Sequence, residues 1–200
     1  MPATMTYLRP DMLTSALDAL ASSPLTVAAG CTGRYPSTER KSLPDGGLDI
    51  TGIESLSGIR RDQDGLRIGG TTTWAEIAEA DLPPALRALQ LAAREVGSRQ
   101  IQNRGTIAGN LCNASPAADG VPPLLVLDAE VELSASSGVR TLPLAAYVTG
   151  PRKTQRRPDE ILTAVKIPAS ALNGRSHFLK LGARTYLVIS ISMVAARVVI

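Results

Sequence analysis

The sequence predicts an α+β fold, because patterns typical of amphipathic helices are followed by patterns typical of antiparallel strands. Apolar residues recur at three- and four-residue spacing in helical segments, as at residues 11–21. Apolar and polar residues alternate at 130–135 and 161–167, as they do in half-buried strands. The repeated strand–helix–strand order of a parallel α/β fold is not seen.

The first fifty residues are expected to contain one helix and two short strands. The helix at 11–21 lies between two prolines and precedes an apolar strand at 25–29, which runs straight into Gly30. A second short strand is expected at 48–51. This region therefore combines a helix, short strands and a glycine-bearing loop that leaves a strand.

The middle of the chain begins with a predicted β-hairpin at 59–68, with turn residues at its centre. Thr73 and Glu76 have the spacing of a capping box, which predicts the start of a helix. A second amphipathic helix is expected at 86–96, where the following glycine ends it.

Three strands are expected after these helices, at 130–135, 139–144 and 161–167. In the first of them Val131 and Leu133 should point to the core, and the polar residues between them should point outward. Short turns between alternating strands favour an antiparallel sheet.

The composition is that of a globular protein with an aliphatic core. Hydrophobic residues make up 44%, charged residues 20% and aromatic residues 3% of the 200 residues, which excludes a disordered chain. The 21 basic and 18 acidic residues give a net charge of +3, too even a balance to indicate a nucleic-acid partner.

Cysteine and histidine usage excludes several metal centres. Cys31 and Cys112 are too few for an iron–sulfur cluster, and His177 alone cannot form a two-histidine site. The N-terminus lacks the apolar segment of a secretory signal, and the apolar run at 186–200 is too short to span a membrane. We therefore expect a cytoplasmic protein without a membrane span.

Two segments rich in small residues form the candidate site, AGCTG at 29–33 and TIAGNLCNASPAAD at 106–119. The glycine-rich fingerprints of Rossmann dehydrogenases and P-loop NTPases and the serine elbow of hydrolases are missing from the sequence. Small residues let the backbone approach a ligand, and consecutive N–H groups bind anions. Two such loops could hold a diphosphate between them, although each alone also fits a plain turn.

Polar side chains in these segments suit a ligand with phosphates and sugar hydroxyls. Thr32, Thr106 and Ser115 add hydroxyl donors, Asn110 adds an amide, and Asp119 adds a carboxylate that can accept from sugar-type hydroxyls.

The two segments resemble the FAD-binding subunit or domain of the molybdenum hydroxylases, such as xanthine dehydrogenase and carbon monoxide dehydrogenase. That family has an A-G-G-T-D loop, similar to 29–33, and a T-I-G-G-N loop followed by A-S-P and an aspartate, similar to 106–119. Further similar stretches are LDAEVEL from Leu127, TGPRKT from Thr149, DEILTAVKIP from Asp159 and FLKLGAR from Phe178. The resemblance runs in order over almost the whole chain.

The resemblance implies a two-subdomain FAD-binding fold. A small N-terminal α/β subdomain is expected at 1–55, a larger α+β subdomain with an antiparallel sheet at 56–172, and the start of a truncated C-terminal subdomain at 173–200. The residues implied to bind FAD are Ala29, Gly30, Cys31, Thr32, Gly33, Thr106, Ala108, Gly109, Asn110, Ser115, Asp119 and Lys180.

Lys180 is the implied catalytic residue, because it resembles a family lysine near the flavin ring. A cation there would stabilise negative charge on reduced flavin. The alternative is an ordinary lysine on a surface strand. Three positions depart from the family pattern, since Cys31 and Ala108 stand where glycine is usual and Gly33 stands where an acid is common.

By resemblance, the chain is the flavoprotein electron-transfer subunit of a multi-subunit molybdenum hydroxylase. FAD would accept electrons from the 2Fe-2S clusters of an iron–sulfur subunit and pass them to NAD, oxygen or another acceptor. The molybdenum cofactor would lie on a further partner subunit. The alternatives are a flavin-less structural subunit with a degenerate site and a stand-alone flavin reductase.

Two further stretches point to partners or ligands. The segment 151–158 carries Arg152, Lys153, Arg156 and Arg157, which form either a solvated loop or a basic rim that faces an anionic partner or cofactor. The apolar run at 187–200 is expected to lack cover within the chain, so that either the chain is a truncated or reduced member of the similar family or another subunit covers this face.

Overall fold

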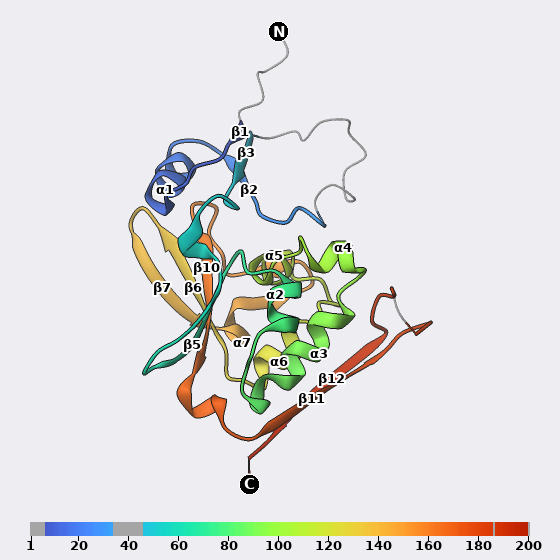
Figure 1. Ribbon diagram of the computed structural model, residues 1–200. Coiled ribbons are helices and arrows are strands. Elements are labelled where there is room, and N and C mark those ends of the chain that lie inside the picture. Colours follow the sequence, from blue (N-terminus) through green and yellow to red (C-terminus); the bar gives the residue numbers. More distant parts are fainter. Residues whose placement is uncertain (1–6, 34–45, 186, 200) are drawn as a thin grey trace.

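The computed structural model describes residues 7–33, 46–185 and 187–199 (Figure 1). These residues form a three-stranded sheet, a five-stranded sheet and two two-stranded hairpins, together with short helices. The α+β fold that the sequence predicts is therefore confirmed.

The three-stranded sheet is parallel and has the order β1 (Tyr7–Leu8), β3 (Gly46–Asp49), β2 (Leu25–Ala28). Helix α1 (Leu13–Ser22) packs against it through an aliphatic cluster. The second predicted strand ends earlier than expected, because Asp49 Oδ1 accepts from the backbone N–H of Thr51 at 2.9 Å and turns the chain.

The five-stranded sheet is antiparallel. Its order is β4 (Ile59–Arg61), β5 (Gly65–Gly69), β10 (Ile161–Pro168), β6 (Glu130–Ala135), β7 (Gly138–Pro143). The predicted hairpin at 59–68 and the three predicted strands after the helices are confirmed.

The predicted alternation of buried and exposed residues is wrong for the central strand β10. All residues from Ile161 to Val165 are buried, because the strand has packing partners on both faces. Ile161 packs into the α1 cluster, whereas Leu162 packs into the main core. Ser134 of β6 is also buried rather than exposed, since its hydroxyl pairs with the buried Thr163 hydroxyl at 3.1 Å.

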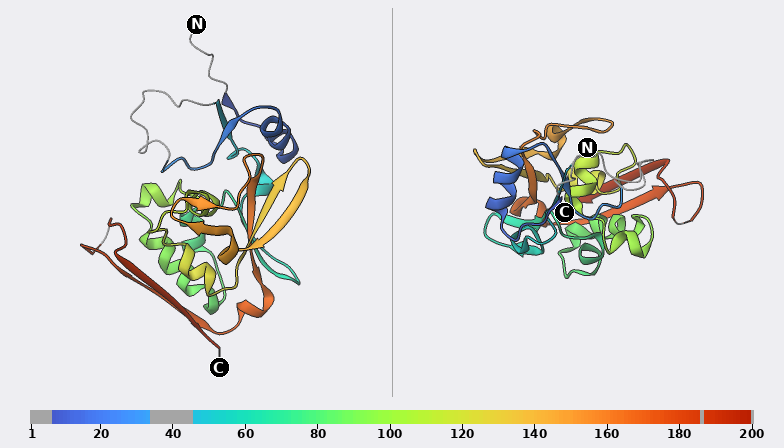
Figure 2. Two further views of the ribbon diagram at one scale, coloured as in Figure 1. Left: turned by 180° about the vertical axis from the view of Figure 1, so that it is seen from behind. Right: turned by 90° about the horizontal axis from the view of Figure 1, so that it is seen from above.

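The helices lie together against one face of this sheet (Figures 1 and 2). They are α2 (Trp74–Glu79), α3 (Arg87–Glu95), α4 (Arg99–Gln102), α5 (Ile107–Asn113), α6 (Val121–Leu125) and α7 (Leu144–Tyr147), with 3₁₀ turns at Glu54–Leu56, Pro84–Leu86 and Ala169–Leu172. The capping box of α2 is confirmed, since the Thr73 hydroxyl accepts from Glu76 N–H and the Glu76 carboxylate accepts from Thr73 N–H. The helix predicted at 86–96 is α3.

Two hairpins complete the fold, β8 (Val148–Gly150) with β9 (Lys153–Thr154), and β11 (Arg175–Leu181) with β12 (Ser192–Val198). The β11–β12 hairpin crosses diagonally over the helices (Figure 1), and Phe178 is buried against Ala88 and Ala92 of α3. Its other face is exposed, with side chains that include Leu179, Leu181, Val194 and Val198.

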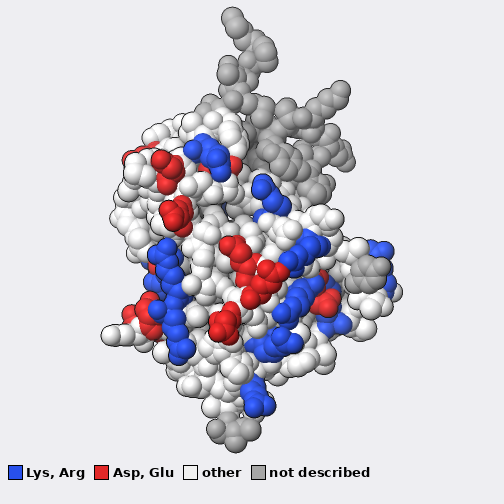
Figure 3. Space-filling model, in the orientation of Figure 1, with Lys and Arg blue, Asp and Glu red and all other residues white. Residues whose placement is uncertain are grey.

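The surface and the helices show two general properties. On the face drawn in Figure 3, basic and acidic side chains are mixed, in keeping with the small net charge. Among the described residues, no helix is both long enough and apolar enough to cross a membrane.

A cluster of charges ties three adjacent strands of the large sheet together around Glu132 of β6. Its carboxylate accepts from Arg67 of β5 at 2.9 Å, and from Thr163 and Lys166 of β10 at 2.8 Å each. Partial burial acts to raise the pKa of Glu132, but the bonds from Lys166, Arg67 and Thr163 outweigh it and hold the pKa at about 2.

We expect this cluster to make the stability of the protein pH-dependent. Because the folded-state pKa of Glu132 lies below its unfolded value, its stabilisation is complete above about pH 5 and is lost as the pH falls towards 2. The free energy of unfolding should fall by about 3 kcal/mol over this range, since one pKa unit corresponds to about 1.4 kcal/mol. Urea unfolding followed by the fluorescence of buried Trp74 measures the slope.

Glu132→Gln should flatten that slope between pH 5 and pH 2 and lower the stability at pH 7, since its amide would face the Lys166 ammonium. Glu130→Gln on the same strand is the matched control, because Glu130 forms no ion pair within the described part of the chain. Equal slopes for wild type and Glu132→Gln would contradict the assignment.

Candidate cofactor-binding site

A cavity of about 1030 Å³ lies where the N-terminal residues meet the rest of the protein. Its wall comes from residues 20–33, from the first residues of α5, and from residues 156–162. This volume is at the upper end of the range for small-molecule and cofactor sites, so that the cavity suits a long ligand.

The first small-residue segment, 29–33, leaves β2 and forms one side of the cavity. It lies directly against the chain that precedes α5, since a Cβ added to Gly30 would stand 1.7 Å from the carbonyl oxygen of Arg104. A Cβ added to Gly105 would lie 3.4 Å from the Thr32 hydroxyl. The structure therefore brings the two segments together, and only glycine fits at residue 30.

Cys31 has a backbone conformation that explains why glycine is usual at this place in the similar family. Its φ is +56°, in the left-handed region that side chains disfavour. The thiol lines the cavity. The loop thus keeps a glycine-type conformation with a side chain present.

The first part of the second segment is not a loop, as the sequence suggested, but helix α5, and residues 114–119 follow the helix as turns. Thr106 caps this helix, because its hydroxyl accepts from the Gly109 N–H at 3.1 Å. The N–H groups of Ile107 and Ala108 donate to the carbonyls of Thr72 and Gly70 at 3.0 and 3.1 Å. Protein acceptors therefore occupy the N–H groups that were expected to face an anion.

Asn110 offers an acceptor to a ligand in the cavity. Its side chain lines the cavity, and Oδ1 is buried without a hydrogen-bond partner among the described residues. Buried polar atoms without partners are rare in folded proteins, because an unmade hydrogen bond costs about 1–3 kcal/mol. Oδ1 has almost no accessible surface and would lie 3.0 Å from a Cβ added to Gly120, so a ligand in the cavity would satisfy it once the side chain turns toward the cavity.

The remaining predicted site residues lie apart from the cavity wall. Asp119 and Lys180 form a buried ion pair at 2.7 Å, in which the two side chains are 8% and 6% exposed. Lys180 also donates to the carbonyl of Glu95, and the Ser190 hydroxyl donates to Asp119. The Ser115 hydroxyl accepts from Ala117 N–H within its own turn. Asp119 and Lys180 thus meet each other, joining β11 to the chain that follows α5.

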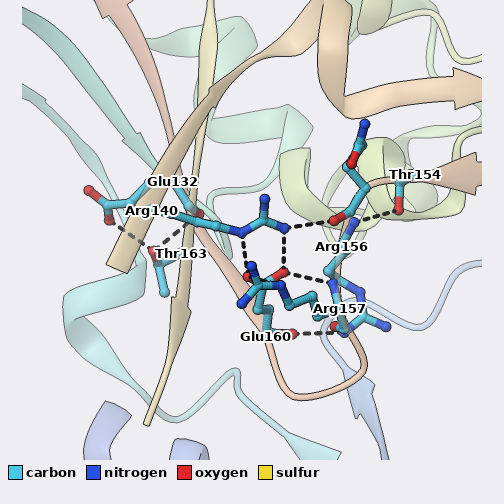
Figure 4. Close-up of polar contacts among 8 residues, drawn as sticks. Glu132, Arg140, Thr154, Arg156, Arg157, Glu160 and Thr163 are labelled. Atoms are coloured by element: carbon cyan, nitrogen blue, oxygen red, sulfur yellow. Dashed lines mark hydrogen bonds and ion pairs between the residues drawn. The ribbon is translucent and has the colours of Figure 1, made fainter. Parts of the chain in front are cut away.

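Residues 156–162 are the part of the wall that the motifs did not assign. Glu160 is buried and its carboxylate accepts from Arg140 of β7 at 2.5 and 2.9 Å and from Arg157 N–H at 2.7 Å (Figure 4). Hydrogen bonding from Arg140 outweighs burial and lowers the pKa of Glu160. This network fixes the segment and places Arg156 in the cavity wall. The sequence indicated this only through the basic composition of residues 151–158.

A thiol–phenol pair lies at the cavity wall, where Cys112 lines the cavity and Tyr147 does not. Cys112 Sγ is 3.3 Å from the Tyr147 hydroxyl, and burial raises the pKa of both groups. The positive charge of Arg156 acts to lower the pKa of both groups, because its guanidinium lies near the end of α5. Neutral Cys112 and Tyr147 therefore pack beside a cation.

The fold and the cavity define a two-part α+β protein with a site for a long, polar cofactor. Residues 3–170 match the family described as "FAD binding domain in molybdopterin dehydrogenase". The chain belongs to this family, whose cofactor is FAD, and the resemblance seen in the sequence is confirmed. The fit to FAD is supported by the cavity volume and by the orphaned Asn110 Oδ1.

Individual relatives agree with this family. The xanthine dehydrogenase FAD-binding subunit of Escherichia coli O157:H7 is 38% identical over 135 residues, which cover 66% of this chain and 46% of that protein. The nicotinate dehydrogenase FAD-subunit of Eubacterium barkeri is 36% identical over 172 residues, which cover 84% and 58%. The chain spans about half the length of these curated relatives.

A solved structure shows the same fold. Carbon monoxide dehydrogenase from Hydrogenophaga pseudoflava, in a form that lacks the Mo-pyranopterin moiety, matches with a TM-score of 0.82 and 25% identity. The match covers 94% of this chain and 67% of that one. The described elements thus have the arrangement of a chain of known structure.

We expect Gly30→Ala to open the contact between the two segments. Its Cβ would collide with the Arg104 carbonyl, so the variant should lose about 1–3 kcal/mol of stability and should release FAD. Gly150→Ala is the matched control, because its Cβ would lie 4.0 Å from its nearest neighbour and Gly150 is not part of the cavity wall. Thermal unfolding and flavin content measure both effects, and a Gly30→Ala protein with normal flavin content would contradict the expectation.

Proposed function

We propose that this chain is the FAD-carrying electron-transfer unit of a molybdenum hydroxylase. In this proposal FAD takes electrons from the 2Fe-2S clusters of an iron–sulfur subunit and passes them to NAD, oxygen or another acceptor. The observation that carries the proposal is the meeting of two distant segments at one cavity, in a chain of this family. We place the protein in the cytoplasm.

FAD, when bound, supplies electron-transfer chemistry that no amino-acid side chain supplies. The work of this chain is to hold and orient it. Gly30 permits the close approach of the two segments, Asn110 accepts a hydrogen bond, and Thr32 adds a hydroxyl donor at the cavity wall.

The other predicted binding residues keep their proposed roles around this cavity. Ala29, Cys31, Gly33, Thr106, Ala108 and Gly109 line it. We propose that Ser115, Asp119 and the Lys180 cation, which lie outside the cavity wall, act at the flavin end by fixing β11 to the chain that follows α5. The ion pair with Asp119 fixes the position of this cation.

We propose that the subdomains follow the boundaries 1–55, 56–172 and 173–200. The three-stranded sheet with α1 belongs to the first, the five-stranded sheet with its helices to the second, and the β11–β12 hairpin to the third. The iron–sulfur subunit and a molybdenum cofactor subunit are the proposed partners.

We expect the purified protein to contain FAD rather than FMN, because the cavity spans two separated segments and suits a dinucleotide. Cofactor released by heat should run as FAD on chromatography. Recovery of FMN alone would contradict the dinucleotide assignment, and a chain with no flavin at all would favour a degenerate structural subunit.

Asn110→Ala should weaken FAD binding about tenfold, since a charge-free hydrogen bond is worth about 0.5–1.5 kcal/mol. Asn103→Ala is the matched control, because Asn103 caps α4 away from the cavity. Asp119→Ala is a poorer test, since it would also leave Lys180 buried without its partner. Equal FAD affinities for both asparagine variants would remove Asn110 from the site.

We expect co-expression with the iron–sulfur and molybdenum subunits to raise soluble yield and flavin content together. Exposed apolar side chains cover the outer face of the β11–β12 hairpin, among them Leu179 at 67% and Val194 at 60% exposed. Such a face favours association. A chain that is monomeric, soluble and fully flavinated alone, by light scattering and absorbance, would contradict this dependence on partners.

A further inference from the structure

We infer that Arg156 is a direct ligand of the cofactor's diphosphate and supplies the positive charge of the cavity. This inference rests on the proposed binding of FAD in this cavity. The observations behind it are the place of Arg156 in the wall, the way its guanidinium is held, and the pairing of the other charges around it.

Arg156 is the one cationic side chain among the described residues that line the cavity. The acids in the same wall are Asp159 and Glu160. Glu160 is already paired with Arg140 and also lies within 3.9 Å of Arg157, so it does not need Arg156 for charge balance. Arg156 itself forms no ion pair within the described ranges.

The guanidinium of Arg156 is held in place by carbonyl groups. Nη1 donates to the carbonyls of Arg157 at 3.0 Å and Glu160 at 2.7 Å (Figure 4). These bonds use one end of the fork, and the Nε and Nη2 donors have no protein partner among the described residues. A pre-positioned fork of this kind matches two phosphate oxygens.

The backbone at the start of α5 offers no free N–H group to the diphosphate. The N–H groups of Ile107, Ala108 and Gly109 all donate to protein acceptors. The diphosphate carries the full negative charges of FAD at neutral pH, and Asp159 adds a further negative charge to the wall. An anion in this cavity therefore needs a cation, and Arg156 is placed to provide it.

The experiment compares Arg156→Gln with Lys153→Gln. Both remove one positive charge from the same segment, but Lys153 is exposed and lies outside the cavity wall. Calorimetric titration of the flavin-free protein with FAD, ADP and adenosine separates the diphosphate from the rest of the ligand. Thermal unfolding of the flavin-free variants reports any structural role.

Arg156→Gln should weaken FAD and ADP binding about ten- to a hundredfold and leave adenosine binding unchanged, since a charge-assisted contact to the diphosphate is lost. Added salt should weaken FAD binding less in this variant than in wild type. Arg156→Lys should recover part of the affinity, Asp159→Asn should strengthen FAD binding, and Lys153→Gln should match wild type.

Two results would overturn the inference. The first is equal FAD affinity for the wild-type and Arg156→Gln proteins. Because the wild-type protein would still bind FAD, this result would leave the proposed function intact. The other is a lower melting temperature with equal losses for ADP and adenosine, which would make Arg156 a structural residue. A wild-type protein that binds no FAD would overturn the proposed function together with the inference.

Discussion

The site depends on one close backbone contact, in which Gly30 lies against the carbonyl of Arg104. This contact joins a loop of the parallel sheet to the chain that enters α5. Trp74 N–H donates to the Gly105 carbonyl at 3.0 Å and Ile107 N–H donates to Thr72, so the same chain is fixed to the start of α2. Because both sides are fixed, the cavity is a property of the fold, and a ligand finds its walls already formed.

Much of the fold could be predicted from local patterns, whereas the chemistry around the cavity could not. The capping box of Thr73 and Glu76 and the hairpin at 59–68 depend on neighbouring residues, which a sequence displays directly. The helical start of α5 was hidden, because small residues fit a loop and a capped helix equally well. The burial of β10 depends on what packs against its two faces, and spacing along the chain carries no such information.

The pairs that surround the site join residues far apart in the sequence. Asp119 and Lys180 were both expected near FAD, but nothing in the sequence indicated that they bind each other. The same holds for Arg140 and Glu160, whose pairing leaves Arg156 free of a carboxylate partner within the described chain. The pairing of buried charges thus determines which cation remains available to a ligand. This pairing can be seen only in the three-dimensional structure.

The conformation of Cys31 bears on whether the site is still in use. A side chain at φ +56° costs about 1–2 kcal/mol relative to a right-handed conformation, and such strain persists only where the surroundings impose it. Gly30 against Arg104 and the Thr32 hydroxyl near Gly105 are the contacts that impose it here. The fold itself therefore holds the strain at Cys31, and the flavin content of the purified protein decides between a chain that binds its cofactor and a degenerate structural subunit.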